Sequence, residues 1–299
     1  MRNEVIDGAR DPHLVREQYE DHWGIVRDHA RQFVAAEPDN LARVVNLCLA
    51  ALADRPRKTR WLRGRKISAI LAGRTIPPRL SPRCIDTITR VAITDLVGSY
   101  CDTTTTRIIE LGSGWGTNLF YLWLSGAPRS AAYVALEYTE VGREVTQLIA
   151  STDQRLSLTT RSFDYYHPDL SEYRTNDKTI AFTCYSIEQI TNLGDSLFEE
   201  LLAIPGLDRV IHVEPVSWQL LADSPFNLLV EPLSYLVPPR LSLEIDVRRR
   251  SRASRYNRDL ISKLRRLERT GRICIEHLEK NYIAPNPLNP GTAIVWRRA

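Results

Sequence analysis

The sequence predicts an α/β fold, with a mostly parallel sheet whose last strand pair is antiparallel, preceded by an all-helical N-terminal segment. Apolar residues recur at helical spacing through the first hundred residues. Beyond about residue 106, short β-branched runs alternate with helical patterns, which is typical of a parallel sheet covered by helices on both faces. The last two predicted strands are joined by a link too short to contain a helix, so they must run antiparallel.

Composition places the chain among ordinary globular proteins. It has 299 residues, of which 43% are hydrophobic and 25% charged. No apolar run reaches the roughly 20 residues that cross a bilayer, and the charged N-terminus does not resemble a signal peptide. The five cysteines lie far apart, and no pair of them has metal-ligand spacing. We therefore expect reduced thiols, a cytoplasmic location, no membrane contact and no bound metal.

The first 83 residues are predicted to form a helical lid or cap region, and residues 84–299 the second domain. Residues 11–53 carry helical spacing, with a cap at Asp39-Asn40 before a second helical run. The stretch TIPPRLSPR breaks the pattern, and a further helix is expected over about 82–98. The first hundred residues are therefore expected to contain helices and no strands.

The rest of the chain follows in alternating order. Five β-branched or apolar runs predict strands at 106–111, 131–137, 157–164, 179–186 and 209–215. Helical patterns lie between them at 117–125, 140–152 and 193–203. A Pro-rich apolar insertion at about 223–247 is interpreted as a lid or as the surface of a homodimer. A helix at about 254–270 and strands at 273–280 and 291–298 complete the prediction.

One short stretch concentrates glycines where the first predicted strand turns into a helix. It reads IIELGSGWGTN over residues 109–119. Glycine is costly within regular structure, so Gly112, Gly114 and Gly116 indicate a sharp turn or a ligand that approaches the backbone closely. In open α/β sheets, ligands bind beyond the carboxyl ends of the strands. The alternative is a glycine turn without a ligand.

Two nucleotide-binding patterns compete for this stretch. The dinucleotide pattern G-x-G-x-x-G requires glycine at position 117, where the chain has Thr117. The pattern acidic-x-G-x-G-x-G fits at every position from Glu110 to Gly116. A carboxylate before the glycines repels a pyrophosphate but suits a cationic ligand such as S-adenosylmethionine, which carries an ammonium and a sulfonium group.

Residues 84–299 resemble the Rossmann-like (class I) S-adenosylmethionine-dependent methyltransferases. The resemblance rests on the ELGSGWG motif, on Glu137 after the second strand and on Asp164 after the third. The resemblance implies that the glycine loop lines the amino-acid part of the cofactor. It also implies that Glu137 binds the ribose and Asp164 the adenine amino group. The cofactor contacts expected on this basis are Glu110, Gly112, Ser113, Gly114, Gly116, Asn118, Glu137, Asp164 and Ser186.

Two further strand ends supply candidates for catalysis. The fourth strand ends in CYSIEQI, which places Ser186, Glu188 and Gln189 near the cofactor's methyl group. The fifth ends in HVEPVSWQL, in which His212 and Glu214 share a strand face. We interpret Glu188 and Glu214 as catalytic, one binding a cationic substrate and the other removing its proton, with Gln189 and His212 as substrate contacts. The alternatives are capping or surface acids and a core histidine.

The N-terminal helix carries aromatic candidates. Tyr19 and Trp23, with His22 between them, could supply an aromatic wall for a cationic substrate. The alternative is that these residues only pack the helix onto the domain.

The leading functional hypothesis is a methyltransferase, with product S-adenosylhomocysteine, acting on an amine or guanidinium nitrogen of an amino acid or related small molecule. One alternative is an RNA methyltransferase, with arginine clusters at 55–66 and 248–272 as the contact surface. We favour a solvated face for these clusters and expect no nucleic-acid partner. The remaining alternatives are an O-methyltransferase of a small metabolite, and a binding or scaffold protein with a relic cofactor pocket.

Overall fold

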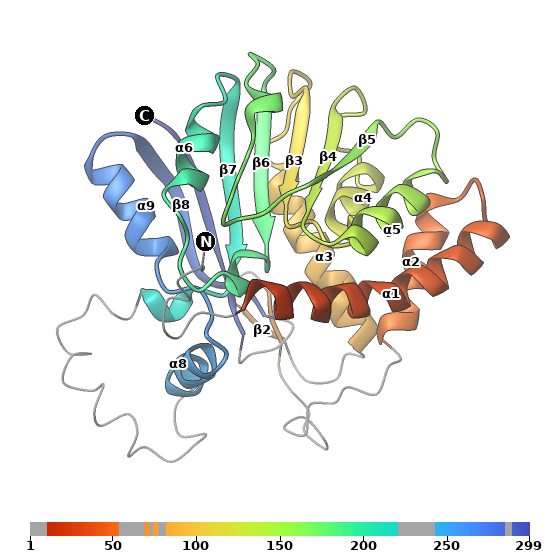
Figure 1. Cartoon of the computed structure of the whole chain (residues 1–299), viewed down its shortest axis with the longest axis horizontal. Helices are drawn as coiled ribbons and strands as arrows, with labels where there is room; N and C mark the ends of the chain where they lie inside the picture. Colours follow the sequence, from red (N-terminus) through yellow and green to blue (C-terminus); the bar gives the residue numbers. More distant parts are fainter. Residues whose placement is uncertain (1–10, 54–68, 72–73, 77–81, 221–242, 285–288) are drawn as a thin grey trace.

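The computed structural model describes residues 11–53, 69–71, 74–76, 82–220, 243–284 and 289–299 (Figure 1). These residues form one nine-stranded sheet in the order β2-β1-β8-β9-β7-β6-β3-β4-β5. The strands are β1 (Ala69–Leu71), β2 (Arg74–Ile76), β3 (Arg107–Leu111), β4 (Ala132–Glu137), β5 (Leu158–Ser162), β6 (Thr179–Cys184), β7 (Leu207–Glu214), β8 (Ile273–Ala284) and β9 (Gly291–Arg298).

The strand directions confirm the predicted Rossmann-like fold. β3, β4, β5, β6 and β7 pair in parallel, whereas β9 is antiparallel to both β7 and β8. The chain runs outward from β3 to β5 and then returns to β6 on the other side of β3. The carboxyl ends of β3 and β6 therefore form a topological switch point, where open α/β sheets bind ligands.

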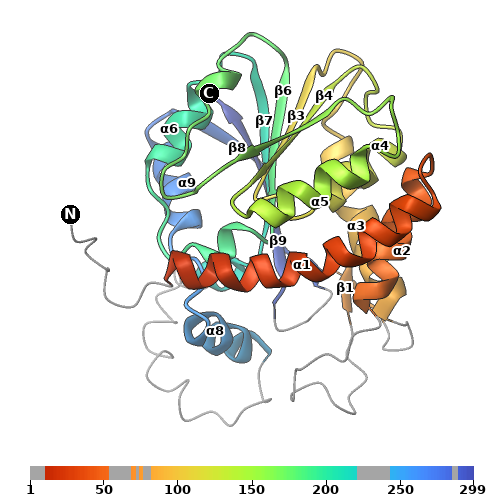
Figure 2. The same ribbon diagram turned by 45° about the vertical axis from the view of Figure 1, so that its right-hand side comes forward.

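Helices cover both faces of this sheet (Figures 1 and 2). The helices of the described residues are α1 (Pro12–Ala36), α2 (Leu41–Ala53), α3 (Pro82–Gly98), α4 (Thr117–Leu124), α5 (Glu140–Ala150), α6 (Ser196–Leu202), α8 (Leu243–Ala253) and α9 (Leu260–Arg269). Short 3-10 turns η1 (Ser171–Tyr173), η2 (Ile187–Gln189) and η3 (Ser217–Gln219) follow β5, β6 and β7. No helix among these described residues is long and apolar enough to span a membrane.

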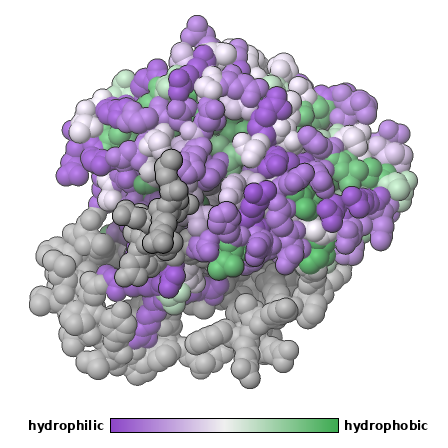
Figure 3. Space-filling model, in the orientation of Figure 1, coloured by the Kyte–Doolittle hydropathy of each residue, from purple (hydrophilic) through white to green (hydrophobic). Residues whose placement is uncertain are grey.

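Alternation along the central strands divides the core into two layers. Ile108 packs with α2, α4 and α5, while its neighbour Ile109 packs with α6 and α9 on the other face. Figure 3 shows a mainly hydrophilic surface with separate apolar spots. The large apolar side chains exposed in the described part of the chain are dispersed over four elements: Leu14, Val91, Leu124 and Leu278.

Two predictions about secondary structure are wrong. The first hundred residues are not all helical, because β1 and β2 extend the sheet beyond β8. Strands of three residues are too short to show alternation in the sequence. The helix expected at 254–270 begins only at Leu260, because the Asn257 side-chain oxygen accepts hydrogen bonds from the Asp259 and Leu260 amides just before it. A separate helix, α8, overlaps the end of the predicted insertion.

Other predictions fall partly or wholly outside the described residues. The insertion is described only from residue 243, so its interpretation as a lid or dimer surface stays a prediction. The arginine cluster at 55–66 lies wholly outside the described residues. The division of the chain near residue 83 also stays a prediction.

α1 crosses the carboxyl ends of β3 and β4 and is held there by its own side chains (Figure 2). It begins at Pro12, and the Asp11 side chain accepts a hydrogen bond from the His13 amide at 2.9 Å. At its middle, Glu20 accepts hydrogen bonds from the Glu140 and Val141 amides at 2.9 and 3.0 Å. These are the first amides of α5, which have no partner within their own helix.

His212 lies in the core rather than at a ligand site, which corrects its prediction as a substrate contact. Its side chain has 0% exposure and is absent from the cavity described below. Its Nε2 accepts a hydrogen bond from the Trp296 indole at 3.0 Å, so the neutral ring carries its proton on Nδ1, 3.0 Å from the Thr183 hydroxyl. Alternation along the strand predicted which face of the sheet carries His212, but it did not predict how deeply the side chain is buried.

Replacing Glu20 tests the attachment of α1. Glu20→Ala removes the carboxylate that caps α5 and is expected to lower the free energy of unfolding by about 1–2 kcal/mol, measured by urea denaturation. Glu17→Ala is the matched control, since Glu17 is exposed on the same helix. Equal stability changes in the two variants would contradict the attachment.

The core histidine gives a second prediction, in acid. Burial lowers the pKa of His212 to about 3, so below pH 6.5 the unfolded chain binds a proton that the folded chain does not. The free energy of unfolding should therefore fall by about 2 kcal/mol from this group between pH 6.5 and 5. His212→Gln should lose that contribution, whereas the exposed His13→Gln should keep it. If His212→Gln fails to fold, NMR of the wild-type ring should show neutral His212 at pH 5, and a protonated ring would refute the prediction.

Candidate cofactor-binding and active site

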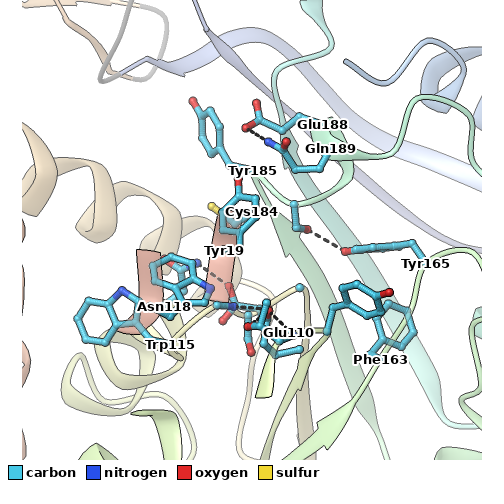
Figure 4. A pocket seen from close by; sticks show the side chains of 18 of the residues that line it. Tyr19, Glu110, Trp115, Asn118, Phe163, Tyr165, Cys184, Tyr185, Glu188 and Gln189 are labelled. Atoms are coloured by element: carbon cyan, nitrogen blue, oxygen red, sulfur yellow. Dashed lines mark hydrogen bonds between the residues drawn. The ribbon is translucent and has the colours of Figure 1, made fainter. Parts of the chain in front are cut away.

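A cavity of about 360 Å³ opens at the carboxyl ends of β3, β4 and β6 (Figure 4). Its walls come from the glycine loop, the segments that follow β4, β5 and β6, and helices α1 and α3. Glu188 and Gln189 lie at one end in the view of Figure 4, and Glu110 and Asn118 at the other. The cavity therefore lies at the switch point of the sheet and is closed by helices that precede the parallel strands in the chain.

The glycine loop turns in a backbone conformation that side chains rarely adopt. Gly112, Gly114 and Gly116 have φ values of +71°, +57° and +75°. A Cβ atom on Gly114 would lie 2.9 Å from the Trp23 ring, so α1 packs directly on the loop. The loop begins with the Gly112 and Ser113 amides donating to the Leu136 carbonyl on β4, at 2.7 and 3.0 Å.

Glu137 at the end of β4 holds this loop in place. Its carboxylate is buried and accepts hydrogen bonds from the Gly114 amide at 2.8 Å and from the Thr139 amide and hydroxyl at 3.0 and 2.6 Å. Glu137 also lines the cavity, and a carboxylate oxygen accepts more than one hydrogen bond. Its predicted contact with a ribose stays a prediction.

Glu110 is a buried carboxylate with one unpaired oxygen. Its Oε1 accepts a hydrogen bond from the Asn118 amide at 2.6 Å, and its Oε2 has no partner among the described residues. Burial raises the pKa of Glu110 to about 8. Two more cavity-lining residues hold buried polar atoms that no described residue satisfies, the Ser113 hydroxyl and the Trp23 indole N–H. Buried polar atoms seldom stay unpaired, so this wall fits a polar ligand.

Sequence analysis missed Arg90, which extends this arrangement. Arg90 on α3 lines the cavity, and its Nη1 donates to the Asn118 side-chain oxygen at 2.7 Å. Asp86, Thr89, Arg90 and Ile93 all line the cavity from one face of α3. Their spacing is the signal that could have indicated a ligand-facing helix, because residues three, four and seven apart share a face.

The segments after β5 and β6 meet behind the glycine loop. The Tyr165 hydroxyl donates to the Leu111 carbonyl at 2.8 Å and lies 2.8 Å from the Ser186 hydroxyl. Asp164 lines the cavity, and its Oδ1 accepts a hydrogen bond from the Tyr166 amide at 2.8 Å. Ser186 and Asp164 therefore lie where the sequence predicts, although their contacts with a cofactor stay untested.

Tyr19 and Trp23 line the cavity from α1, as the predicted aromatic wall requires. Their ring centroids are 5.8 Å apart. On the same helix, the Arg16 guanidinium lies 5.2 Å from the centroid of the Tyr138 ring. α1 thus forms part of the site, and what its aromatic side chains bind stays a prediction.

Glu188 lies on the cavity wall between two amide side chains. Its Oε1 accepts from Gln189 Nε2 at 2.7 Å and its Oε2 from Asn289 Nδ2 at 2.9 Å (Figure 4 shows the first contact). Asn289 belongs to the β8–β9 connection, 101 residues away, and sequence analysis did not find it. The preceding Tyr185 has φ +52°, a strained value for tyrosine, and its hydroxyl donates to the Ile283 carbonyl at 3.0 Å.

The prediction of a catalytic role for Glu214 is corrected by its position. The side chain has 0% exposure and lies outside the cavity wall. Its Oε1 accepts from the Ser186 and Ile187 amides, both at 3.2 Å, and its Oε2 from the Glu188 amide at 3.3 Å. Burial, and then the Glu188 carboxylate, raise the pKa of Glu214 to about 8. Glu214 therefore caps the turn that carries Glu188. This position fits the alternative prediction, in which the acid at this strand end is a capping residue.

Metal ligation finds no support in the described ranges, where no group of three or more His, Cys, Asp or Glu side chains could hold an ion. The described carboxylates of the cavity wall instead outnumber its arginines: Asp86, Glu110, Glu137, Asp164 and Glu188 against Arg16 and Arg90. These carboxyl groups offer several hydrogen-bond acceptors to a polar ligand.

Comparisons with known proteins return matches only among solved structures. No protein-family model and no curated protein matches the chain. Magnesium protoporphyrin IX methyltransferase from Synechocystis PCC 6803, with bound SAH, is 12% identical over 73% of this chain and 83% of its own, with a TM-score of 0.41. A SAM-dependent methyltransferase from Aquifex aeolicus is 11% identical over 74% and 100%, with a TM-score of 0.44. Geranyl diphosphate methyltransferase is 8% identical over 70% and 78%, also with a TM-score of 0.44. All three of these solved structures are methyltransferases.

Proposed function

We propose that the protein is an S-adenosylmethionine-dependent methyltransferase that acts on a nitrogen of a small, polar, cationic molecule. One observation carries the proposal. Beside a loop of three left-handed glycines at the carboxyl end of β3, the buried carboxylate of Glu110 keeps an unpaired oxygen on a predominantly acidic cavity. An ammonium group beside this oxygen would favour the ionised form of Glu110 and pair with it, whereas a pyrophosphate would gain no such partner.

Residues around the cavity fit each part of this cofactor. The glycine loop and Glu110 would hold the amino-acid part, Glu137 the ribose hydroxyls and Asp164 the adenine. When bound, S-adenosylmethionine supplies a methyl group on a positively charged sulfur, which a neutral nucleophile displaces in line. The cavity volume of about 360 Å³ lies within the range of small-molecule sites.

Glu188 is the residue that we assign to the acceptor. Two amide donors, from Gln189 and Asn289, fix its carboxylate on the cavity wall. Tyr19 and Tyr185 line the same cavity and offer aromatic faces to a cation. We infer that Glu188 binds the acceptor nitrogen and takes its proton, which leaves the lone pair available for methylation. Glu214 acts through the turn that it caps and does not reach the acceptor.

The surface charges of α9 favour the small-molecule acceptor over RNA. Asp195 accepts hydrogen bonds from Lys263 and Arg266, and Glu199 from Arg272. Three of the eleven basic residues of the 248–272 cluster are therefore paired with acids of the protein, as on a solvated face. The described cysteines carry free thiols, which supports a cytoplasmic location.

Direct titration with S-adenosylhomocysteine tests the cofactor. Calorimetry should show that S-adenosylhomocysteine binds saturably to the wild type and that NAD does not bind. Gly114→Ala places a Cβ against Trp23 at positive φ and should weaken binding at least about tenfold. Gly24→Ala is the matched control, because its Cβ would meet nothing within 4 Å. A wild type that binds NAD, or neither compound, would overturn the proposal.

Binding should also release a proton at neutral pH. With a pKa raised to about 8, Glu110 is mostly protonated at pH 7 in the free protein, and a neighbouring ammonium would favour its ionised form. Affinity for S-adenosylhomocysteine should therefore rise as pH increases from 6 to 8, by at most about tenfold per unit. Calorimetry in two buffers of different ionisation enthalpy measures the release, which Glu110→Gln should abolish. Identical release by this variant would refute the assignment.

Methyl incorporation from labelled S-adenosylmethionine into fractionated cell metabolites tests Glu188. Glu188→Gln should lower incorporation about 100-fold while leaving affinity for S-adenosylhomocysteine unchanged. The exposed Glu172→Gln should match the wild type. Undiminished incorporation by Glu188→Gln would contradict its role. Incorporation that disappears after ribonuclease treatment would favour the RNA alternative.

A further inference from the structure

The connection between β8 and β9 reaches the cavity wall at Glu188. Asn289, just before β9, donates from its side-chain nitrogen to Glu188 Oε2 at 2.9 Å. The side-chain oxygen of Asn289 is buried and has no partner among the residues that the structure describes. Within that part of the chain, the contact with Glu188 therefore fixes the direction of this amide. A segment 101 residues away in the chain thus orients a carboxyl group of the cavity.

Tyr185 holds both described ends of this connection. Its hydroxyl donates to the Ile283 carbonyl at 3.0 Å, near the end of β8, and lies 3.3 Å from the Asn289 carbonyl. A Cβ atom on Gly291 would lie 2.8 Å from the same hydroxyl, so the start of β9 packs directly on it. Tyr185 and Glu188 both line the cavity (Figure 4). One side chain of the cavity wall therefore fixes the place from which Asn289 reaches Glu188.

The backbone of Tyr185 has an unusual conformation at this point. Its φ of +52° is a strained value for a non-glycine residue, and such values persist only where surrounding contacts hold them. Its amide donates to the Val213 carbonyl on β7 at 3.0 Å. Burial raises the pKa of its hydroxyl well above the usual value, so the hydroxyl keeps its proton and remains a donor. Strained residues that are held in this way cluster at functional sites.

We propose that Asn289 and Tyr185 are positioning residues for methyl transfer: Tyr185 holds the β8–β9 connection, and Asn289 orients the Glu188 carboxyl group for proton transfer from the acceptor. The inference rests on the proposed function, in which Glu188 takes that proton. A general base works only within hydrogen-bond reach and in the right direction, so its orientation affects the rate. Asn289 acts through Glu188, and the Tyr185 hydroxyl acts through Asn289.

A double-mutant cycle tests whether Asn289 acts through Glu188. Methyl incorporation is measured over a dilution series of the active metabolite fraction, which gives a plateau rate. Asn289→Ala should lower this rate about tenfold and change the affinity for S-adenosylhomocysteine less than about twofold. In a Glu188→Gln background the same change should cost less than about twofold, because the base that it orients is already absent. The exposed Asn192→Ala, on the segment after η2 and outside the cavity wall, should match the wild type.

A second variant at the same position covers the case in which Asn289→Ala does not fold. Asn289→Asp is nearly identical in size but replaces the donor with an acceptor, so it should lower the plateau rate at least as much. Undiminished incorporation by the variants that fold would overturn the inference. A loss that is equally large with and without Glu188 would also overturn it, because Asn289 would then only support the fold.

Tyr185→Phe tests the hydroxyl, since the ring stays on the cavity wall. It should lower the plateau rate about threefold alone and have no further effect in Asn289→Ala. A full additional loss in that background would overturn the role of the hydroxyl. A Glu188→Gln variant as active as the wild type would overturn the role of Glu188 and, with it, this inference. A wild type that binds no S-adenosylhomocysteine, or methylates no fraction, would overturn the proposed function itself.

Discussion

The hydrogen bond from the Gly114 amide to the Glu137 carboxylate is the contact on which the site depends. It joins the end of β4 to the turn after β3 and so fixes the glycine loop in the conformation in which its glycines have positive φ values. Because the loop is fixed, the Trp23 ring can pack against Gly114 without a gap, and α1 can cross the strand ends. The cavity is therefore the space that this one loop conformation leaves between β3, β4, β6 and the two N-terminal helices that face them.

Helix α1 completes the site because its side chains satisfy groups that the sheet domain leaves unpaired. The first amides of α5 would lack partners without Glu20, and Tyr138 lies beneath the Arg16 guanidinium. Helix α1, which belongs to the segment expected to be a lid or cap, is thus bound by hydrogen bonds to α5, the helix that follows β4. Changes in α1 should consequently affect both the stability of the fold and the shape of the cavity.

Sequence alone could predict the parallel strands, the glycine loop and the acids that follow β4 and β5, because each is a local pattern in a short window. It could not predict how deep a side chain lies. His212 and Glu214 share a strand face, yet one is enclosed by Thr183 and Trp296 and the other by the backbone amides of η2. Nor could it find Asn289, which reaches the site from the distant β8–β9 connection and carries no motif of its own, and Arg90 is indicated only by the helical spacing of the α3 residues. The short strand β1 pairs with the edge of β8, and β2 pairs with β1, so both depend on a contact with a segment about 200 residues further along the chain.

The partners of the four buried glutamates near the strand ends divide them into two kinds. Glu137 and Glu214 accept hydrogen bonds from backbone amides, so each serves to fix a turn after a strand. Glu110 and Glu188 are held instead by side-chain amides, from Asn118 in one case and from Gln189 and Asn289 in the other. A neutral amide orients a carboxyl group, so these two acids are fixed on the cavity wall. The cavity therefore carries oriented carboxyl groups at two separate points, one beside the glycine loop and one beside η2. The proposed cationic methyl donor and cationic acceptor would each find one of these two acids.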